Sequence, residues 1–395
     1  MRELKGRKIA STCRLCFQSF LRQFGMRWLL LLLTAVSALA QSGPRVQFSH
    51  TPESLRGVSA VSRQVAWASG THGTYLRTVD GGSTWGPAQV SDAAALDFRA
   101  VVAFSADEAF LMSAGPGEQS RIYHTSDAGQ HWQLQLKNDN PKGFFDSMVF
   151  WDAKHGIVLG DPIADDTGKL KFELLVTEDG QSWRRVPSSQ LPDAMEGEGA
   201  FAASNTCLAI ALGAASDVWF ATGGKVARVF HSGDRGKTWE VFNTPMIHGP
   251  DSAGIFSIAF RDAQHGVIAG GDYKRPKDDG PNLAFTEDGG KTWTLPSLHP
   301  LAYFSAIAYD RRVNDLAAQS RAAEATSTKK TRVKAIDPER LFIVGQDFIF
   351  DFHPPNNPRR IDGRKKLGMA FNAVSAYPEG GALIVGVKGT MGFIP

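Results

Sequence analysis

One short phrase recurs five times along this chain of 395 residues, at intervals of about 50 residues. The first copy reads Thr-Val-Asp-Gly-Gly-Ser-Thr-Trp over residues 78–85, and every copy keeps an Asp, a Gly and a final Trp. A phrase that recurs at such spacing indicates repeated supersecondary units. The Asp and Trp residues of the five copies are Asp80 and Trp85, Asp127 and Trp132, Asp179 and Trp183, Asp234 and Trp239, and Asp288 and Trp293.

The residue types of the phrase predict the tip of a β-hairpin. An Asp carboxylate accepts hydrogen bonds from backbone amides two residues further on, and Gly supplies the positive φ that tight turns require. The final Trp offers a large apolar surface that can anchor the tip on its neighbour. We therefore expect each copy to be a structural clip.

Each copy follows two β-rich stretches, and the second of them ends in a Gly-rich turn. Two more such stretches follow the last copy, which brings the predicted number of units to seven. The second stretches are 65–70, 109–115, 156–160, 218–223, 266–270, 341–345 and 382–386. Their partners, the innermost strands, are predicted to begin near Val58, Arg99, Asp146, Phe201, Phe256, Phe304 and Phe371.

The two ends of the chain are predicted to meet in the last unit. That unit ends at residues 391–395 with three strands, whereas residues 45–50 form a strand without a unit. Placing the N-terminal strand outside the last unit covers an edge that would otherwise be exposed.

The repeated phrase resembles the Asp-box, or BNR repeat, of sialidases and many other β-propellers. The resemblance implies an all-β, seven-bladed β-propeller, with Asp-boxes in blades one to five and the last blade closed by the N-terminal strand. In this family the box is structural and lies away from the sialidase active site, so it predicts the fold and not the function.

Residues 1–40 read as an export signal. They hold seven Lys or Arg and one Glu, followed by an apolar run from Trp28 to the Ala38-Leu39-Ala40 cleavage motif. The run is shorter than the ~20 residues of a membrane-spanning helix, so an uncleaved anchor is the weaker alternative. Met26 offers a second possible start. We expect a periplasmic or extracellular protein of residues 41–395, without a membrane span and monomeric.

Loss of residues 1–40 changes the charge of the chain. The mature protein has 36 Lys plus Arg against 39 Asp plus Glu, so its formal charge is −3 where the precursor has +3. The basic pI near 8.7 therefore belongs to the precursor, and a nucleic-acid partner is not expected. Residues 311–337, which are rich in Ala, Lys, Arg, Ser and Thr, are predicted to be an inserted loop.

The sequence gives no convincing cofactor or metal site. Cys13 and Cys16 leave with the signal, and Cys207 is expected to be a buried structural thiol. His155 and His265 occupy the same Asp-Ala-x-His-Gly turn in two units, which favours a structural role. The pairs at 165–166 and 278–279 are only weak calcium candidates.

The strand order places the boxes on the same face as the loops between first and second strands. The opposite face gathers the entries to the innermost strands and the loops between second and third strands. Mixed charges on that face predict a binding site, although the same residues can instead satisfy one another and the Gly-rich loops. The candidate binding residues are Arg99, Asp146, Asp161, Glu198, Arg228, Asp272, Tyr273 and Lys274.

Two functional hypotheses follow from resemblance. The wording of the repeats, with phrases such as Gly-Glu-Gly-Ala-Phe-Ala-Ala-Ser over 197–204, resembles exported propellers like the photosystem II assembly and stability factors, which bind and do not catalyse. This implies a protein or glycan partner. The alternative is a sialidase-like glycoside hydrolase that uses Tyr273, Glu198 and Asp161. Phe98-Arg99-Ala-Val departs from the sialidase Arg-Ile-Pro motif, which puts that alternative in doubt.

Overall fold

The computed structural model describes residues 44–211, 216–296, 302–312, 340–345, 349–353, 356–360 and 370–395. The predicted signal, and the predicted inserted loop apart from Arg311 and Arg312, lie outside the described residues. Residues Gly43–Pro395 form one compact unit. Besides strands, the described residues hold the short 3-10 helices η1 (Gly117–Gln119), η2 (Ser188–Gln190) and η3 (Val387–Gly389). No helix in these ranges is long and apolar enough to cross a membrane.

The described strands form seven antiparallel sheets, most of which use consecutive strands. Sheet one holds β2 (Leu55–Ala60), β3 (Ala66–Gly70), β4 (Thr74–Thr78) and β5 (Gly86–Gln89). Sheet two holds β6 (Asp97–Ala103), β7 (Ala109–Ala114), β8 (Arg121–Thr125) and β9 (Gln133–Lys137). Sheet three holds β10 (Phe145–Asp152), β11 (His155–Ala164), β12 (Leu170–Thr177) and β13 (Arg184–Arg185).

The later sheets include pairings between distant parts of the chain. Sheet four holds β15 (Leu208–Ile210), β16 (Val218–Ala221), β18 (Arg228–Ser232) and β19 (Glu240–Asn243). Sheet five holds β20 (Ala253–Phe260), β21 (Gly266–Asp272) and β22 (Leu283–Thr286). Two short strands, β17 (Gly223–Gly224) and β14 (Glu198–Gly199), extend this sheet from the edge of β20 that does not pair with β21. Sheet six holds β23 (Phe304–Tyr309), β24 (Leu341–Gly345), β25 (Ile349–His353) and β26 (Asn356–Arg360). Sheet seven holds β27 (Phe371–Ala376), β28 (Ala382–Gly386), β29 (Thr390–Ile394) and β1 (Arg45–Phe48).

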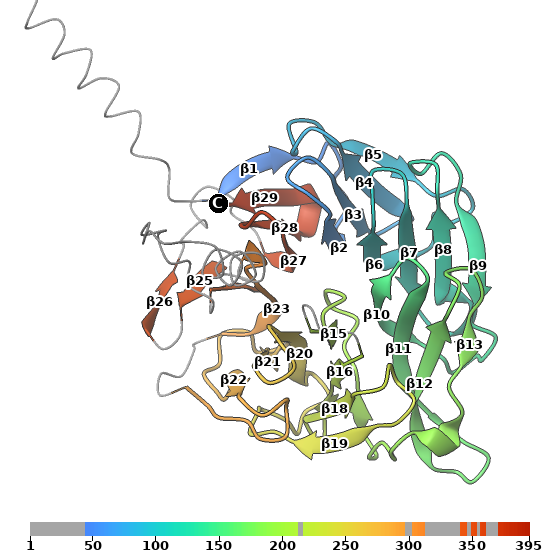
Figure 1. Ribbon diagram of the computed structural model, residues 1–395, viewed down its shortest axis with the longest axis vertical. Helices are drawn as coiled ribbons and strands as arrows, with labels where there is room; N and C mark the ends of the chain where they lie inside the picture. The colour runs from blue at the N-terminus through green and yellow to red at the C-terminus, as the bar shows by residue number, and fades with distance from the viewer. Residues whose placement is uncertain are drawn as a thin grey trace, which may run out of the picture. The chain divides into compact units, whose positions relative to one another are not determined.

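The sheets stand around a common axis, as Figure 1 shows. Their innermost strands contact one another in the order β2, β6, β10, β15, β20, β23, β27 and back to β2. Side-chain hydrogen bonds join neighbours in this circle: the Ala60 amide donates to Ser375 Oγ at 3.1 Å, and the Ala103 amide donates to Ser59 Oγ at 3.0 Å. This is the arrangement of a β-propeller.

The hydrophobic core lies between neighbouring sheets. One cluster joins Trp67 of β3 to Phe98 and Leu111 of the next sheet, and all three side chains are fully or almost fully buried. Another cluster joins Leu55 and Leu76 of sheet one to Leu383 of sheet seven. Because each sheet packs mainly on its two neighbours, the stability of every sheet depends on closure of the circle.

The N-terminal strand completes the last sheet as its outermost strand, as predicted. β1 runs antiparallel to β29, with Arg45 opposite Phe393 and Phe48 opposite Thr390. The Gln47 side chain of β1 also reaches the first box: its Nε2 donates to the Gly81 carbonyl and its Oε1 accepts from Trp85 Nε1, both at 3.2 Å.

Four of the boxes form the predicted turns between the third and fourth strands of their sheets, and the fifth turns from β22 to an isolated bridge between Phe285 and Thr294. In the first box the Asp80 carboxylate accepts from the Thr78 hydroxyl at 2.8 Å, and from the amide and hydroxyl of Thr84 at 2.9 and 2.6 Å. These hydrogen bonds lower the pKa of Asp80 to about 2. The Gly81 amide donates to the Gln64 carbonyl in the loop after β2, which confirms that boxes and first-to-second loops share a face.

The boxes also link neighbouring sheets. In four of the five, a glycine carbonyl of the turn accepts a hydrogen bond from a side chain of the preceding sheet. The donors are Gln47 to Gly81, Tyr75 to Gly129, Gln135 to Gly180 and Trp219 to Gly289. In these four boxes the preceding sheet therefore also binds the tip through a hydrogen bond.

One predicted strand position is wrong. The innermost strand of sheet four begins at Leu208 and not near Phe201. Residues 201–207 instead form a turn in which Asn205 has a φ of 64°. The Asn205 side chain accepts from the Met148 amide at 2.7 Å and donates to the Met148 carbonyl at 3.0 Å. This turn therefore takes the place of a strand beside β10.

Candidate functional site

A β-bulge stands at the start of six innermost strands. Each register shift leaves one residue without a paired partner. A bulge bends its strand and redirects the side chain of the extra residue. All six of these side chains line one cavity of about 550 Å³ at the end of the strands opposite the boxes. The six residues are Arg56, Arg99, Asp146, Phe256, Ser305 and Asn372.

The sequence around each bulge explains this convergence. The preceding residue is a large apolar side chain that is fully or almost fully buried, and the following residue is Gly, Ala or Ser. The large side chain fixes the strand in the core, and the small residue lets the innermost strands approach one another. The residue between them is thereby held at the mouth of the circle. The triplets are 55–57, 98–100, 145–147, 255–257, 304–306 and 371–373.

One side of the cavity carries two arginines that share a carboxylate. Arg99 Nε donates to Asp97 Oδ2 at 2.9 Å, and Arg99 Nη1 donates to the Ala202 carbonyl at 2.7 Å. Arg56 Nε lies 3.9 Å from Asp97 Oδ1, too far for a hydrogen bond, and both of these buried atoms lack a hydrogen-bond partner. Burial lowers the pKa of Arg56, and the positive charge of Arg99 lowers it further.

The cavity also carries two carboxyl groups, of Asp146 and Asp161, that accept hydrogen bonds from backbone amides. The Ala200 amide donates to Asp161 Oδ1 at 3.0 Å, and burial raises the pKa of Asp161 to about 6. Asp146 is only 1% exposed, and its Oδ2 has no hydrogen-bond partner. Burial raises the pKa of Asp146 well above its ordinary value, and Asp161 raises it further; Arg99 and a backbone hydrogen bond from Ala202 oppose this shift.

Aromatic rings form the third wall. Phe201 and Phe256 stack with centroids 3.8 Å apart, and Tyr303 meets Phe256 edge-on at 4.8 Å. Tyr273 approaches the same ring at 6.1 Å and is 43% exposed. The cavity therefore offers charged groups of both signs next to a flat apolar surface, a combination that suits an extended peptide or a similarly mixed ligand.

The structure brings four of the eight predicted binding residues to this cavity. Arg99, Asp146, Asp161 and Tyr273 line it. Glu198 and Arg228 lie apart from its lining and are both 6% exposed. They pair with each other because β14 and β18 bring them together below the surface.

Asp272 and Lys274 also lie outside the cavity lining. Asp272 accepts from the Lys274 amide and from Arg275 Nε, both at 2.9 Å, so it stabilises the turn after β21. Lys274 is exposed, with Nζ 6.0 Å from the centre of the Tyr273 ring. These two positions are explained by turn chemistry, the alternative that the sequence left open.

The residues of the sialidase-like alternative do not come together as one set. Tyr273 and Asp161 line the cavity, but the Glu198 carboxylate accepts from Arg228, from the Thr222 hydroxyl and from the Met195 amide. A carboxylate so fully engaged is not available to activate a tyrosine nucleophile. Two arginines line the cavity, where the sialidase pattern needs three.

Several lining residues were not predicted, notably Arg56, Tyr303, Ser305 and Asn372. The sequence did contain a signal for the three that stand at bulges, because each lies between a large apolar residue and a small one. Comparing that triplet across the repeats identifies Arg56 from Arg99. Tyr303, which is 6% exposed and precedes a bulge triplet, has no such pattern.

The two Asp-Ala-x-His-Gly motifs, at 152–156 and 262–266, form structural turns. Asp152 Oδ1 accepts from the amides of Lys154 and His155 at 2.8 and 3.0 Å, and Asp262 does the same for Gln264 and His265 at 2.9 and 2.8 Å. This confirms the repeated turn. Cys207 is buried, as predicted. Among the described residues, no group of three or more His, Cys, Asp or Glu side chains is placed to hold a metal ion.

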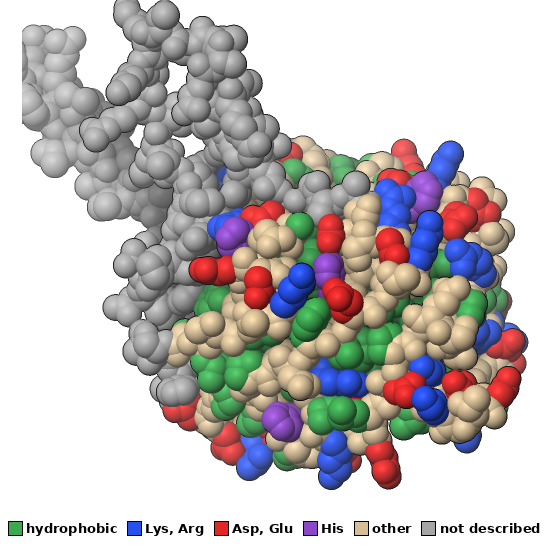
Figure 2. All heavy atoms as spheres, turned by 60° about the horizontal axis from the view of Figure 1, so that its bottom comes forward, with side chains coloured by type: hydrophobic (Ala, Val, Ile, Leu, Met, Phe, Trp, Pro, Cys, Tyr) green, Lys and Arg blue, Asp and Glu red, His purple; other side chains and the backbone are tan. Residues whose placement is uncertain are grey.

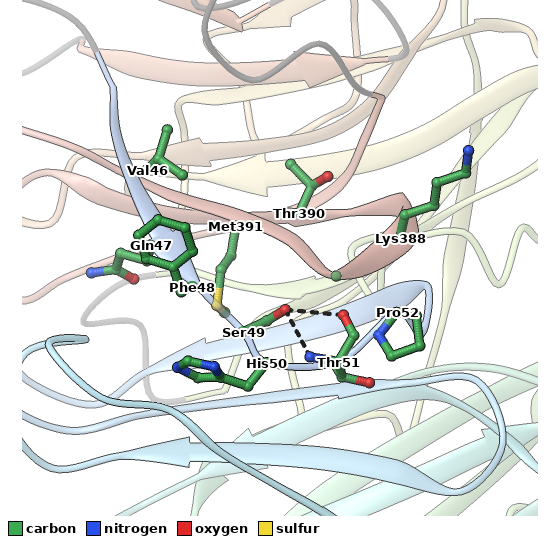
Figure 3. Close-up of a pocket in the computed structure, with 11 residues that line it drawn as sticks. Val46, Gln47, Phe48, Ser49, His50, Thr51, Pro52, Lys388, Thr390 and Met391 are labelled. Atoms are coloured by element: carbon green, nitrogen blue, oxygen red, sulfur yellow. Dashed lines mark hydrogen bonds between the residues drawn. The ribbon is translucent and has the colours of Figure 1, made fainter.

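A second hollow of about 530 Å³ lies beside β1, η3 and β29 (Figure 3). Phe48, Met391 and Lys388 line it, and the Ser49 hydroxyl hydrogen-bonds within the loop to Thr51. Phe48 is 75% exposed. The residues that line this hollow include Lys388 but no Asp, Glu or Arg, so the central cavity is the stronger candidate for a binding site. The face in Figure 2 mixes acidic and basic side chains without a broad area of either sign.

Comparisons with known proteins agree with this architecture. The family model described as photosynthesis system II assembly factor YCF48 matches residues 44–143. A search of curated proteins found no match. Among solved structures, YCF48 bound to D1 peptide has 16% identity and a TM-score of 0.58, covering 90% of this chain and 96% of that chain.

Two further structures share the fold. YCF48 from Cyanidioschyzon merolae has 15% identity and a TM-score of 0.57, covering 89% of this chain and 98% of that chain. The WD40 β-propeller domain of Doa1 has 10% identity and a TM-score of 0.54, covering 89% and 97%. The chain is thus a β-propeller that resembles the photosystem II assembly factors.

Proposed function

We propose that this protein is a non-catalytic binding propeller that holds a segment of a protein partner in its central cavity. The observation that carries the proposal is the convergence of six bulge side chains on one cavity, where Arg56 Nε and Asp146 Oδ2 are buried without hydrogen-bond partners. Buried polar atoms are nearly always satisfied in a working complex, by protein, water or ligand. A similar propeller, YCF48, has been solved bound to D1 peptide, which supports a protein over a glycan as partner.

We further propose that the ring has seven blades, one for each sheet. The continuous circle of contacts between innermost strands supports this count. We also propose that the protein is exported and monomeric. Sequencing the N-terminus of the protein recovered from its native compartment tests cleavage after Ala40, and analytical ultracentrifugation tests the monomer.

The binding proposal is tested with a random peptide library displayed on phage and selected against residues 41–395. The cavity variant is Arg56→Ala with Arg99→Ala. The matched control is Lys237→Ala with Lys291→Ala, which removes the same charge from exposed positions on the boxes. Selected peptides should lose at least about tenfold in affinity for the cavity variant and keep their affinity for the control. Recovery of no peptide, or equal binding to both variants, would count against the proposal.

A further inference from the structure

The charges around the cavity do not balance. Two guanidinium groups, of Arg56 and Arg99, face three carboxyl groups, of Asp97, Asp146 and Asp161. Asp97 already forms ion pairs with both arginines, with N–O distances of 3.9 Å to Arg56 and 2.9 Å to Arg99. If every group were ionised, the cavity would hold one uncompensated negative charge.

The excess lies at Asp146 and Asp161. Asp146 has no ion-pair contact among the described residues, and its Oδ2 is without a hydrogen-bond partner although the side chain lines the cavity and is 1% exposed. Asp161 receives one hydrogen bond, from Ala200. A buried carboxylate needs a partner charge or several donors, so this pair is poised to accept both.

The surroundings favour a slender cation. Phe201 lies between Ala200 and Ala202, the residues whose backbone amides bind the two carboxyl groups, and its ring stacks on Phe256. An aliphatic stem can lie along these rings while a compact ammonium group, with three donors, reaches the deeply placed Asp146. A guanidinium is planar and broader and binds best where two acceptor oxygens face its fork, whereas Asp146 has one oxygen, Oδ2, without a hydrogen-bond partner.

We propose that Asp146 and Asp161 receive the ammonium group of a lysine side chain from the protein partner. This inference rests on the proposed function, because it assigns the chemistry of one residue of the bound segment.

Lysine binding should be coupled to proton release. The groups that act on Asp146 are Asp161, Arg99 and the backbone of Ala202. Cys207 is a neighbour whose pKa is raised by burial and, to a smaller extent, by the charge of Asp146. Without ligand, burial and Asp161 favour protonated Asp146. An adjacent ammonium favours the ionised form, so binding drives the Asp146 proton into solvent. The lysine keeps its own proton.

The test uses N-acetyl-L-lysine methylamide as probe, with its Nε-acetylated form as the uncharged control. Titrations are followed through the amide signals of Ala200 and Ala202 in alanine-labelled protein, and by calorimetry in two buffers of different ionisation enthalpy. We expect both signals to shift with the charged probe only, and the two buffers to report protons released. Binding without proton release, or equal binding of the acetylated probe, would overturn the inference.

The variant Asp146→Asn with Asp161→Asn should lose at least about tenfold in probe affinity. Its matched control, Asp166→Asn with Asp279→Asn, makes the same charge change at exposed positions and should bind as wild type. Thermal melting checks that both variants fold; if the double variant does not, Asp161→Asn alone replaces it. Library peptides that depend on Arg56 and Arg99 but tolerate Lys→norleucine, together with no probe binding, would sink the lysine assignment and leave the binding function intact.

Discussion

Glu198 and Arg228 form a two-sided buried ion pair. Arg228 Nε donates to Glu198 Oε1 at 2.9 Å, and Arg228 Nη2 donates to Glu198 Oε2 at 2.5 Å. The Thr222 hydroxyl donates a third hydrogen bond to the Glu198 carboxylate, at 2.7 Å from Oε1. Because the two side chains come from β14 and β18, the pair joins the strand added to sheet five to the third strand of sheet four.

Removing one member of this pair should be far more harmful than removing both. Glu198→Ala leaves the Arg228 guanidinium buried without its counter-charge, and we expect a loss of about 3–5 kcal/mol in the free energy of unfolding. Glu198→Leu combined with Arg228→Met should recover much of that loss. Urea denaturation measures both. A Glu198→Ala protein within about 0.5 kcal/mol of wild type would show that the pair is not structural.

The pair also shows why the sequence predicted only part of the site. The boxes and the order of strands depend on local chemistry, namely turn residues and alternating apolar stretches, and these were readable. Whether Glu198 faces the cavity depends on Arg228, and no local pattern announces a pairing between residues that distant along the chain. The turn at Asn205 is a similar case, because its partner Met148 lies in another sheet.

Asp161→Asn should stabilise the protein at neutral pH but not in acid. The folded-state pKa of Asp161, about 6, lies above its ordinary value of 3.8, so ionisation costs more in the folded protein than in the unfolded chain. The free energy of unfolding of the wild type should therefore fall as pH rises from about 4 to about 6. The Asn variant, which does not ionise and can still accept a hydrogen bond from the Ala200 amide, should show no such fall.

The difference between variant and wild type should grow by about 1–3 kcal/mol over that interval and stay constant above it. Urea denaturation of the two proteins at several pH values measures it. A difference that does not change with pH would mean that Asp161 is solvated in the folded protein.

The box carboxylates should matter for stability and not for binding. Asp234 accepts from the Ser232 hydroxyl at 2.8 Å and from the hydroxyl and amide of Thr238 at 2.6 and 2.9 Å. Asp234→Ala should lower the free energy of unfolding by roughly 1–3 kcal/mol, because it leaves these donors to water or unpaired. Peptides selected on the wild-type protein should keep their affinity. Weaker binding by the folded variant would place a binding surface on the box face.

The pairing of β1 with β29 and its contacts with the first box should control the stability of the whole ring. Gln47 binds both Gly81 and Trp85 of the first box, just as Gln135 binds Gly180 and Trp183 of the third. Gln47→Leu removes two hydrogen bonds across the junction between the first and last sheets and should cost about 1–3 kcal/mol. Gln135→Leu removes the same contacts within the circle and is the matched comparison.

Deleting residues 41–50 should have a larger effect than either substitution. It removes β1, exposes the edge of β29 and removes the Gln47 hydrogen bonds to the first box, so the melting temperature should fall by several degrees or more. Phe48→Ser, at an exposed position of the same strand, should leave it nearly unchanged. Because every sheet depends on its neighbours, loss at this junction should spread around the ring as a broader transition. A deletion protein that melts at the wild-type temperature would show that the circle is held without β1.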